Sequence, residues 1–361
     1  MKNEYENIYS STLLDFRKVK YFMVLSEPFV YTISYMKKKK WIILTLTVSI
    51  LVVLYIPGGY IASLIVFHVL YDKRMSSLDS KNNKESDTYC LREDYPFPEE
   101  EKIQILSNKN ELVIHHYVSE NKKGAFLTAH GMSSFAGGRE STYEYEIFKL
   151  GYDIYALDLT ASGESEGDSI QGLSQGIQDV KSAIDEVLTR EDHIYMSGYS
   201  WGAYSLLCAS SYSDKINGVI SFSSFTSASE EMKWSVESHI GPVVNLFSWT
   251  MESCAYLKYG QDTTLKTYEV MDKSECKYLL FQGDQDKTVG NGYASTLYHY
   301  LHQKNDRVTT VLFEGKNHNN VFYSKEAIEY VNSLKSDEEI DRYKASEIDE
   351  NIVKAIQDFL K

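Results

Sequence analysis

The sequence predicts an α/β domain with a mostly parallel, eight-stranded sheet, helices on both faces and a small cap, preceded by one transmembrane helix. Two observations carry this prediction. From residue 101 onward, short β-branched or aromatic runs alternate with helical patterns, as in strand–helix–strand units. Upstream of them, residues 41–71 contain no Asp, Glu, Lys or Arg, which is typical of a membrane span.

The charges of the 361-residue chain are unevenly placed around a net charge of −14. Residues 1–40 carry eight basic and four acidic side chains, whereas residues 72–361 carry 29 basic and 47 acidic ones. An acidic body argues against a nucleic-acid partner. The four cysteines are scattered and form no C-x-x-C pair, which argues against a disulfide scaffold and a zinc site.

These shifts in composition divide the chain. We expect a basic tail at 1–40, a transmembrane segment at 41–71, a polar linker at 72–100 and the α/β domain at 101–361, with a cap insertion at about 226–272.

The predicted span is longer than the roughly 20 residues that cross about 30 Å of hydrocarbon. Pro57 and the two glycines after it can kink a single span or end it near Tyr55, and each half alone is short for a hairpin of two spans. A buried core helix and a cleaved signal peptide are the alternatives. Lys37–Lys40 favour a cytoplasmic N-terminus and an extracytoplasmic body, although within about 20 residues of the span four basic residues follow it and four precede it. Membrane lipid is then a partner of residues 41–71.

The strand candidates are apolar on both faces in the later part of the chain, as expected of buried parallel strands. The first two can form a hairpin. The candidates are Lys102–Ser107, Glu111–Ser119, Gly124–His130, Tyr152–Leu159, His193–Tyr199, Ile216–Phe222, Cys276–Gln282 and Val308–Glu314.

A candidate nucleophile stands where the fifth strand candidate meets a helical pattern. Ser200 is the centre of Gly198-Tyr199-Ser200-Trp201-Gly202, a G-x-S-x-G pentapeptide. A tight strand-to-helix turn exposes a serine hydroxyl, and the glycines Gly198 and Gly202 remove side chains that would collide there.

A serine needs a base, and the base needs a carboxylate that fixes its tautomer. His318 follows the last strand candidate, so it lies at the same sheet edge as Ser200. Two carboxylates follow the preceding strand, and we prefer Asp286 to Asp284, which stands directly after the strand and suits a turn. Ser200, Asp286 and His318 therefore form the predicted catalytic triad.

Acyl transfer also needs two donors for an oxyanion. The backbone amide of Trp201 follows the nucleophile, and the amide of Met132 lies in the loop after the third strand, so we expect these two. His130 and Gly131 precede Met132. A histidine there can serve as a second base, but we favour a role in organising its loop.

With these residues in place, the sequence resembles the α/β-hydrolases, nearest the branch of serine aminopeptidase-type and monoacylglycerol-lipase-like enzymes. Five blocks carry the resemblance over about residues 100–361. They are His130-Gly131-Met132, the Asp158–Gly167 stretch, the serine pentapeptide, Gly283 to Val289 around Asp286, and Gly315 to His318. Thr160 replaces the usual Arg, and Trp201 is larger than the family commonly has after the nucleophile.

The resemblance and the triad together imply a membrane-anchored serine hydrolase that cleaves carboxylic esters through an acyl-enzyme, with lipid-like esters among the candidate substrates. The alternatives are a peptidase, thioesterase or acyltransferase with the same triad, or a non-catalytic anchored interaction module. The partner is then a small-molecule or lipid-like acyl substrate. No metal or organic cofactor is expected, because the triad supplies nucleophile, base and charge stabilisation. The cap holds Trp234, Phe247, Trp249, Met251 and Tyr256, which either line an acyl pocket or pack the cap.

Overall fold

The computed structural model describes residues 38–74, 88–290, 294–303, 305–335 and 339–361. The chain divides into two compact units, residues 1–59 and residues 60–361. The predicted basic tail lies outside the described residues except for its last three positions.

The apolar segment is one helix, α2, which runs without a break over Lys38–Tyr71. Pro57 therefore does not end the helix near Tyr55, and that alternative is wrong. Its stretch Ile43–Tyr71 has 29 residues and a mean hydropathy of 2.3, long and apolar enough to cross a membrane. In the first unit, the side chains from Ile43 to Ile56 are exposed, so this part of the helix is not a buried core helix.

An eight-stranded sheet forms the centre of the second unit, in the order β1-β2-β4-β3-β5-β6-β7-β8. The predicted hairpin is present, since β1 pairs antiparallel with β2. β2 also pairs antiparallel with β4, and the remaining pairs are parallel. Each strand lies within two residues of its predicted bounds. The strands are β1 Glu101–Ser107, β2 Asn110–Tyr117, β3 Gly124–Ala129, β4 Tyr152–Leu157, β5 Ile194–Tyr199, β6 Ile216–Phe222, β7 Lys277–Gly283 and β8 Val308–Phe313.

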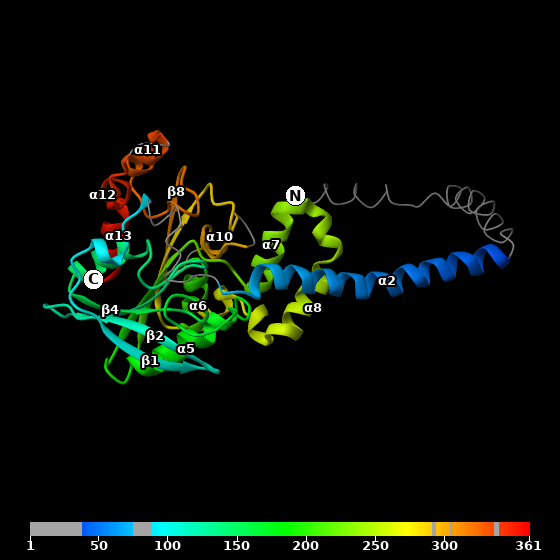
Figure 1. Ribbon diagram of the computed structural model, residues 1–361, viewed down its shortest axis with the longest axis horizontal. Helices are drawn as coiled ribbons and strands as arrows, with labels where there is room; N and C mark the ends of the chain where they lie inside the picture. The colour runs from blue at the N-terminus through cyan, green and yellow to red at the C-terminus, as the bar shows by residue number, and fades with distance from the viewer. Residues whose placement is uncertain (1–37, 75–87, 291–293, 304, 336–338) are drawn as a thin grey trace, which may run out of the picture. The chain divides into compact units, whose positions relative to one another are not determined.

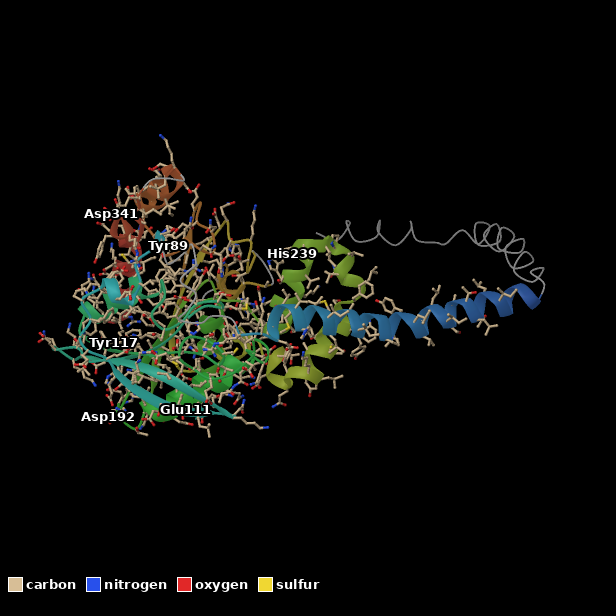
Figure 2. All side chains as sticks on the ribbon, viewed as in Figure 1. Tyr89, Glu111, Tyr117, Asp192, His239 and Asp341 are labelled. Carbon is tan, nitrogen blue, oxygen red and sulfur yellow. The ribbon has the colours of Figure 1, made fainter. Side chains whose placement is uncertain are left out.

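Helices cover both faces of this sheet, and two apolar cores result. The last turns of α2, with α5, α6, α7 and α10, contribute to one core, and α4, α11 and α13 contribute to the other. Side chains fill the space on both sides of the strands (Figure 2). The helices are α4 Ser141–Lys149, α5 Gln175–Val187, α6 Trp201–Ala209, α7 Ala228–Ile240, α8 Ser248–Tyr259, α9 Thr267–Met271, α10 Thr296–Tyr300, α11 Lys325–Ser333, α12 Arg342–Ala345 and α13 Glu350–Phe359, with short 3-10 turns η1 Arg92–Asp94, η2 Gly241–Leu246 and η3 Gln261–Thr264.

The predicted cap comprises α7, η2, α8, η3 and α9, inserted between β6 and β7. Figure 1 shows α7 and α8 standing to one side of the sheet. Ser227 caps α7 by accepting a hydrogen bond from the Glu230 amide, which satisfies one of the free donors of the first turn.

The end of α2 is part of the second unit. Phe67 and Tyr71 are buried in its core. Beyond the helix, the Arg74 guanidinium donates to the carbonyl oxygens of Gly163, Ser165 and Gly167 at 2.7–3.0 Å. These contacts hold the helix end against the loop that follows β4.

The second half of the predicted linker packs on the domain. Residues 75–87 lie outside the described residues, but beyond them the Cys90 amide donates to Ser346 Oγ at 2.7 Å. Arg92 is buried in an ion pair with Glu144, and its guanidinium lies 4.5 Å from the Phe97 ring centroid. A buried charge needs such partners. Residues 88–100 therefore belong to the domain, and the prediction of a linker there is wrong.

Candidate active site

The turn between β5 and α6 presents Ser200. Its φ of 51° and ψ of −113° are unusual for a residue with a side chain, and such a conformation costs about 1–3 kcal/mol. The Ser200 amide donates to the Phe222 carbonyl at 2.8 Å, and the Ser200 carbonyl accepts from the Tyr204 amide at 2.9 Å. The surrounding hydrogen bonds thus hold the strained residue in place.

The glycines beside Ser200 are required by close backbone contacts. A Cβ at Gly202 would lie 2.2 Å from the Ala129 carbonyl oxygen, and one at Gly198 would lie 2.9 Å from the same atom. The two glycines therefore let β5 and α6 approach the end of β3, as the pentapeptide predicts.

The structure brings the three predicted triad residues together from three loops. His318 Nε2 lies 3.0 Å from Ser200 Oγ, and His318 Nδ1 lies 2.7 Å from Asp286 Oδ2. All three side chains are buried. A proton on Nδ1, donated to the carboxylate, leaves the Nε2 lone pair free to accept the serine proton.

Asp286, and not Asp284, contacts the histidine. Its Oδ1 accepts from the amides of Thr288 and Val289, each at 3.0 Å, and its Oδ2 also accepts from Gln282 Nε2 at 2.7 Å. Asp284 instead accepts from the Gly315 amide at 2.7 Å, which ties down the loop that carries His318.

The loop after β3 lies directly against Ser200. A Cβ at Gly131 would lie 3.5 Å from the Ser200 Cβ. The amides of Met132 and Trp201 have no acceptor among the residues that the structure describes. Two free amides beside a serine hydroxyl can bind a developing oxyanion.

His130 lies in this loop, and among the described residues its ring forms hydrogen bonds with backbone groups. Its Nδ1 donates to the Gly131 carbonyl at 2.7 Å, and its Nε2 accepts from the Leu159 amide at 3.2 Å. The Gly131 amide donates to Glu140 Oε1 at 3.0 Å. His130 therefore organises the loop, and the histidine that contacts Ser200 is His318.

The Asp158–Gly167 block supports the same region. Asp158 Oδ1 accepts from the Ala136 amide and its Oδ2 from the Glu164 amide, each at 2.7 Å. Burial alone would raise the pKa of the Asp158 carboxyl. The hydrogen bonds to this carboxyl and the charge of His115 act in the opposite direction, and the pKa is lowered from its usual value. Asp158 thereby connects the oxyanion loop with the loop that Arg74 contacts.

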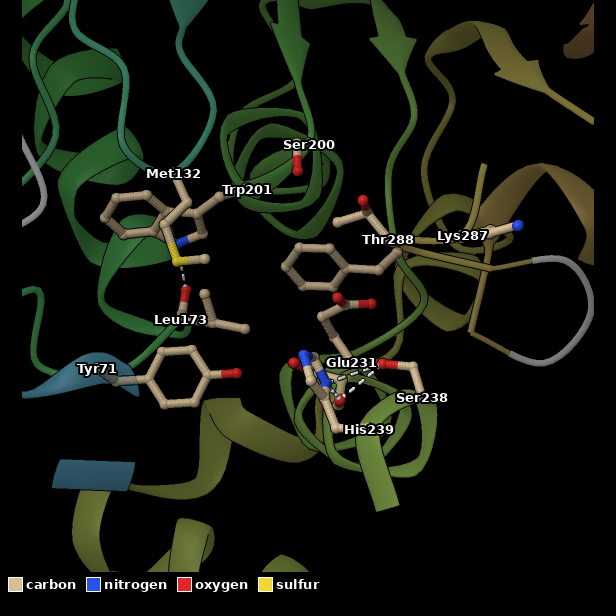
Figure 3. A pocket seen from close by; sticks show the side chains of 12 residues that line it. Tyr71, Met132, Leu173, Ser200, Trp201, Glu231, Ser238, His239, Lys287 and Thr288 are labelled. Carbon is tan, nitrogen blue, oxygen red and sulfur yellow. Dashed lines mark hydrogen bonds between the residues drawn. The ribbon is translucent and has the colours of Figure 1, made fainter. Parts of the chain in front are cut away.

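A cavity of about 390 Å³ opens beside the triad, within the usual range for a small-molecule site. One wall is apolar and contains the side chains of Met132, Leu173 and Trp201 (Figure 3). Phe225 adds a further apolar side chain to the lining. The other residues that line it are Tyr71, Ser200, Glu231, Ser235, Ser238, His239, Lys287 and Thr288. Among the described residues, no group of His, Cys, Asp and Glu side chains could hold a metal ion.

Comparisons with known proteins bear on the fold and the enzyme class. A family model for serine aminopeptidases (S33) matches residues 120–275. The chain is a serine hydrolase of the α/β-hydrolase type.

Solved structures share the fold of this hydrolase. The esterase Pf2001 of Pyrococcus furiosus has a TM-score of 0.51 at 14% identity, over 74% of this chain and 94% of that one. A second crystal form of the same esterase has a TM-score of 0.50 at 16% identity, over 74% and 91% of the two chains. No sequence among the curated proteins matches.

Tyr71 and Glu231 are among the cavity residues of the hydrolase that sequence reasoning missed. Tyr71 is the last residue of the apolar run, and Glu231 is one of two consecutive glutamates at a helix start, which usually face solvent. No local pattern distinguishes either. None of the five predicted cap residues lines the cavity; Met251 is buried in the core, and Trp234 donates from Nε1 to the Lys287 carbonyl at 3.1 Å.

Proposed function

We propose that this hydrolase is a membrane-anchored esterase that cleaves carboxylic esters through an acyl-enzyme on Ser200. The observation that carries the proposal is the unbroken chain of contacts from Ser200 Oγ to His318 to Asp286. The apolar wall of the cavity supports an acyl or alkyl group beside the serine.

In the proposed reaction, Ser200 Oγ attacks the ester carbonyl as His318 Nε2 takes its proton. The carbonyl oxygen becomes an oxyanion, which the amides of Met132 and Trp201 bind. His318 then gives the proton to the departing alcohol, and the acyl group remains on Ser200. Water, deprotonated by His318, then attacks the acyl-enzyme, and the acid leaves as His318 returns the proton to Ser200 Oγ.

The experiment is labelling by a fluorophosphonate probe, with turnover of p-nitrophenyl esters. The wild-type chain should be labelled and should hydrolyse the esters, and Ser200→Ala should do neither. Equal labelling of wild type and Ser200→Ala would refute the assignment of the nucleophile.

A peptidase is the second candidate, because the matching family model describes serine aminopeptidases. Both chemistries use the same triad. Rates on p-nitrophenyl esters and on aminoacyl p-nitroanilides of matched size separate the two. Faster turnover of the amides would favour the peptidase.

Helix α2 is the proposed anchor. Besides its own exposed side chains, apolar side chains of the cap are exposed on the second unit, among them Ile240, Leu246 and Leu257. Such apolar surface is typical of contact with lipid. We expect the full chain to stay in the membrane fraction after alkaline carbonate extraction. Lys37–Lys40, which precede the charge-free stretch, support an extracytoplasmic hydrolase domain, which protease protection in intact cells tests.

A further inference from the structure

One carboxyl oxygen in the cavity has no hydrogen-bond partner in the part of the chain that the structure describes. Glu231 lies on the first turn of α7, is 8% exposed and lines the cavity. Its Oε2 is buried and has no hydrogen-bond partner among the described residues. A buried polar group without a partner is unusual, and inside an active-site cavity it points to a bound ligand group.

A second polar group faces the same space. The Tyr71 side chain is buried at the end of α2, and its hydroxyl has no hydrogen-bond partner among the residues described. Figure 3 shows the Glu231 side chain extending from α7 into the cavity, and the Tyr71 hydroxyl pointing to the same space from the opposite wall. The two groups come from elements far apart in the sequence, and both are open to whatever fills the cavity beside Ser200.

The protonation of Glu231 narrows the choice of ligand. Burial, helped by the negative charge of Asp286, raises the pKa of this carboxyl well above its ordinary 4.5. The uncharged acid is thereby favoured, and it can both donate and accept a hydrogen bond. The Tyr71 hydroxyl can do the same. A hydroxyl group, which is itself donor and acceptor, complements both.

Other ligand groups fit less well. A cation would form no ion pair with the uncharged acid of Glu231, and the positively charged residue Lys287 is also among the residues that line the cavity. An alkyl group would leave both the carboxyl and the phenol unpaired, and sites built to bind a hydroxyl reject substrates that lack it.

We propose that Glu231 and Tyr71 form a subsite that binds a hydroxyl group of the substrate. The preferred substrates are then uncharged esters that carry a free hydroxyl on the part that enters the cavity. This inference rests on the proposed esterase function and names its substrate class.

The test uses the full-length protein in detergent and matched pairs of esters, with and without a terminal hydroxyl. One series carries the hydroxyl on the acyl chain, as p-nitrophenyl ω-hydroxyalkanoates against the plain alkanoates. The other carries it on the alcohol, as ω-hydroxyalkyl butyrates against alkyl butyrates. Chain length is varied in both, so that the hydroxyl is moved along the cavity.

The wild type should prefer the hydroxylated member of at least one series by about tenfold in kcat/KM, the effect of one or two hydrogen bonds. Glu231→Leu should bring that ratio to about one. Tyr71→Phe should lower the ratio as well, whereas Glu231→Gln should keep most of it, because an amide still donates and accepts. The matched control is Glu230→Gln: Glu230 is the neighbouring carboxyl, pairs with Lys266 at 3.2 Å and does not line the cavity, so its ratio should match the wild type.

Two outcomes overturn the inference alone: a wild type that hydrolyses both members of every pair equally, or a Glu231→Leu variant that keeps the preference. If Glu231→Leu does not fold, Tyr71→Phe decides, and an unchanged ratio in that variant counts against the subsite. A wild type that turns over no ester and takes no fluorophosphonate on Ser200 refutes the proposed function, and the subsite with it.

Discussion

Asp286→Asn is the substitution whose effect follows most directly from the geometry. Oδ1 of Asp286 accepts from two backbone amides, of Thr288 and Val289, and Oδ2 accepts from Gln282 Nε2 and faces His318 Nδ1. Asparagine has one oxygen and one NH₂. Because the two backbone amides cannot turn away, the oxygen must stay at the Oδ1 position, and the NH₂ must face His318.

An NH₂ cannot accept the proton on Nδ1, so the imidazole of the variant moves that proton to Nε2. Nε2 then points an N–H at Ser200 Oγ, 3.0 Å away, and cannot take the serine proton. Loss of the correct tautomer lowers kcat by about 10⁴-fold, or about 5.5 kcal/mol. The assay is steady-state hydrolysis of a p-nitrophenyl ester, with the rate of fluorophosphonate labelling as a second measure.

Asp284→Asn is the matched control, two residues away on the same loop. Its Oδ1 accepts from the Gly315 amide, and the asparagine oxygen can do the same, so activity should stay within about twofold of the wild type. Our reasoning fails if Asp286→Asn keeps more than about a tenth of the wild-type rate while folded, or if Asp284→Asn loses as much.

Three further predictions concern stability. Gly202→Ala should destabilise the fold by about 3 kcal/mol or more, because the new Cβ would lie 2.2 Å from the Ala129 carbonyl oxygen, and thermal unfolding measures this. Arg92→Leu should lower the free energy of unfolding in denaturant by about 3–5 kcal/mol, since Glu144 stays buried without its ion-pair partner. The double variant that also carries Glu144→Leu should recover much of this loss. Glu231→Gln should become more stable relative to the wild type as pH rises from about 5 to about 8. The raised pKa of Glu231 means that the native state keeps a proton which the unfolded chain releases, so wild-type stability is complete below about pH 4.5 and falls by up to about 1.4 kcal/mol per pH unit toward the native pKa. A constant difference in Tm over that range would contradict this account.

The sheet and the contacts around Ser200 could be predicted because they follow from local sequence patterns and because the loops that carry these patterns lie at one edge of the sheet. Strands were recognised by short apolar runs, and parallel strands bring the loops after them to one edge, so Ser200, Asp286 and His318 had to lie near one another. Glu231 and Tyr71 carry no such signal. Their place in the cavity depends on how the cap and the end of α2 pack on the sheet, which is tertiary information. The packing of residues 88–100 was missed for the same reason, because the partner of Arg92 is Glu144, far along the chain.

The packing of α2 also explains its length. The helix has 34 residues, but its last turns, from Tyr60 on, belong to the second unit, where Phe67 and Tyr71 are buried in the core. The charge-free residues that remain for a membrane are 41–59, and these 19 positions rise about 29 Å as a helix, close to the roughly 30 Å of hydrocarbon in a bilayer. The length of the proposed anchor therefore matches the hydrocarbon thickness of one bilayer only when the end of the helix is counted as part of the hydrolase domain. Because Tyr71 at that end also faces the cavity, one continuous helix supplies both the proposed membrane span and a wall of the candidate active site.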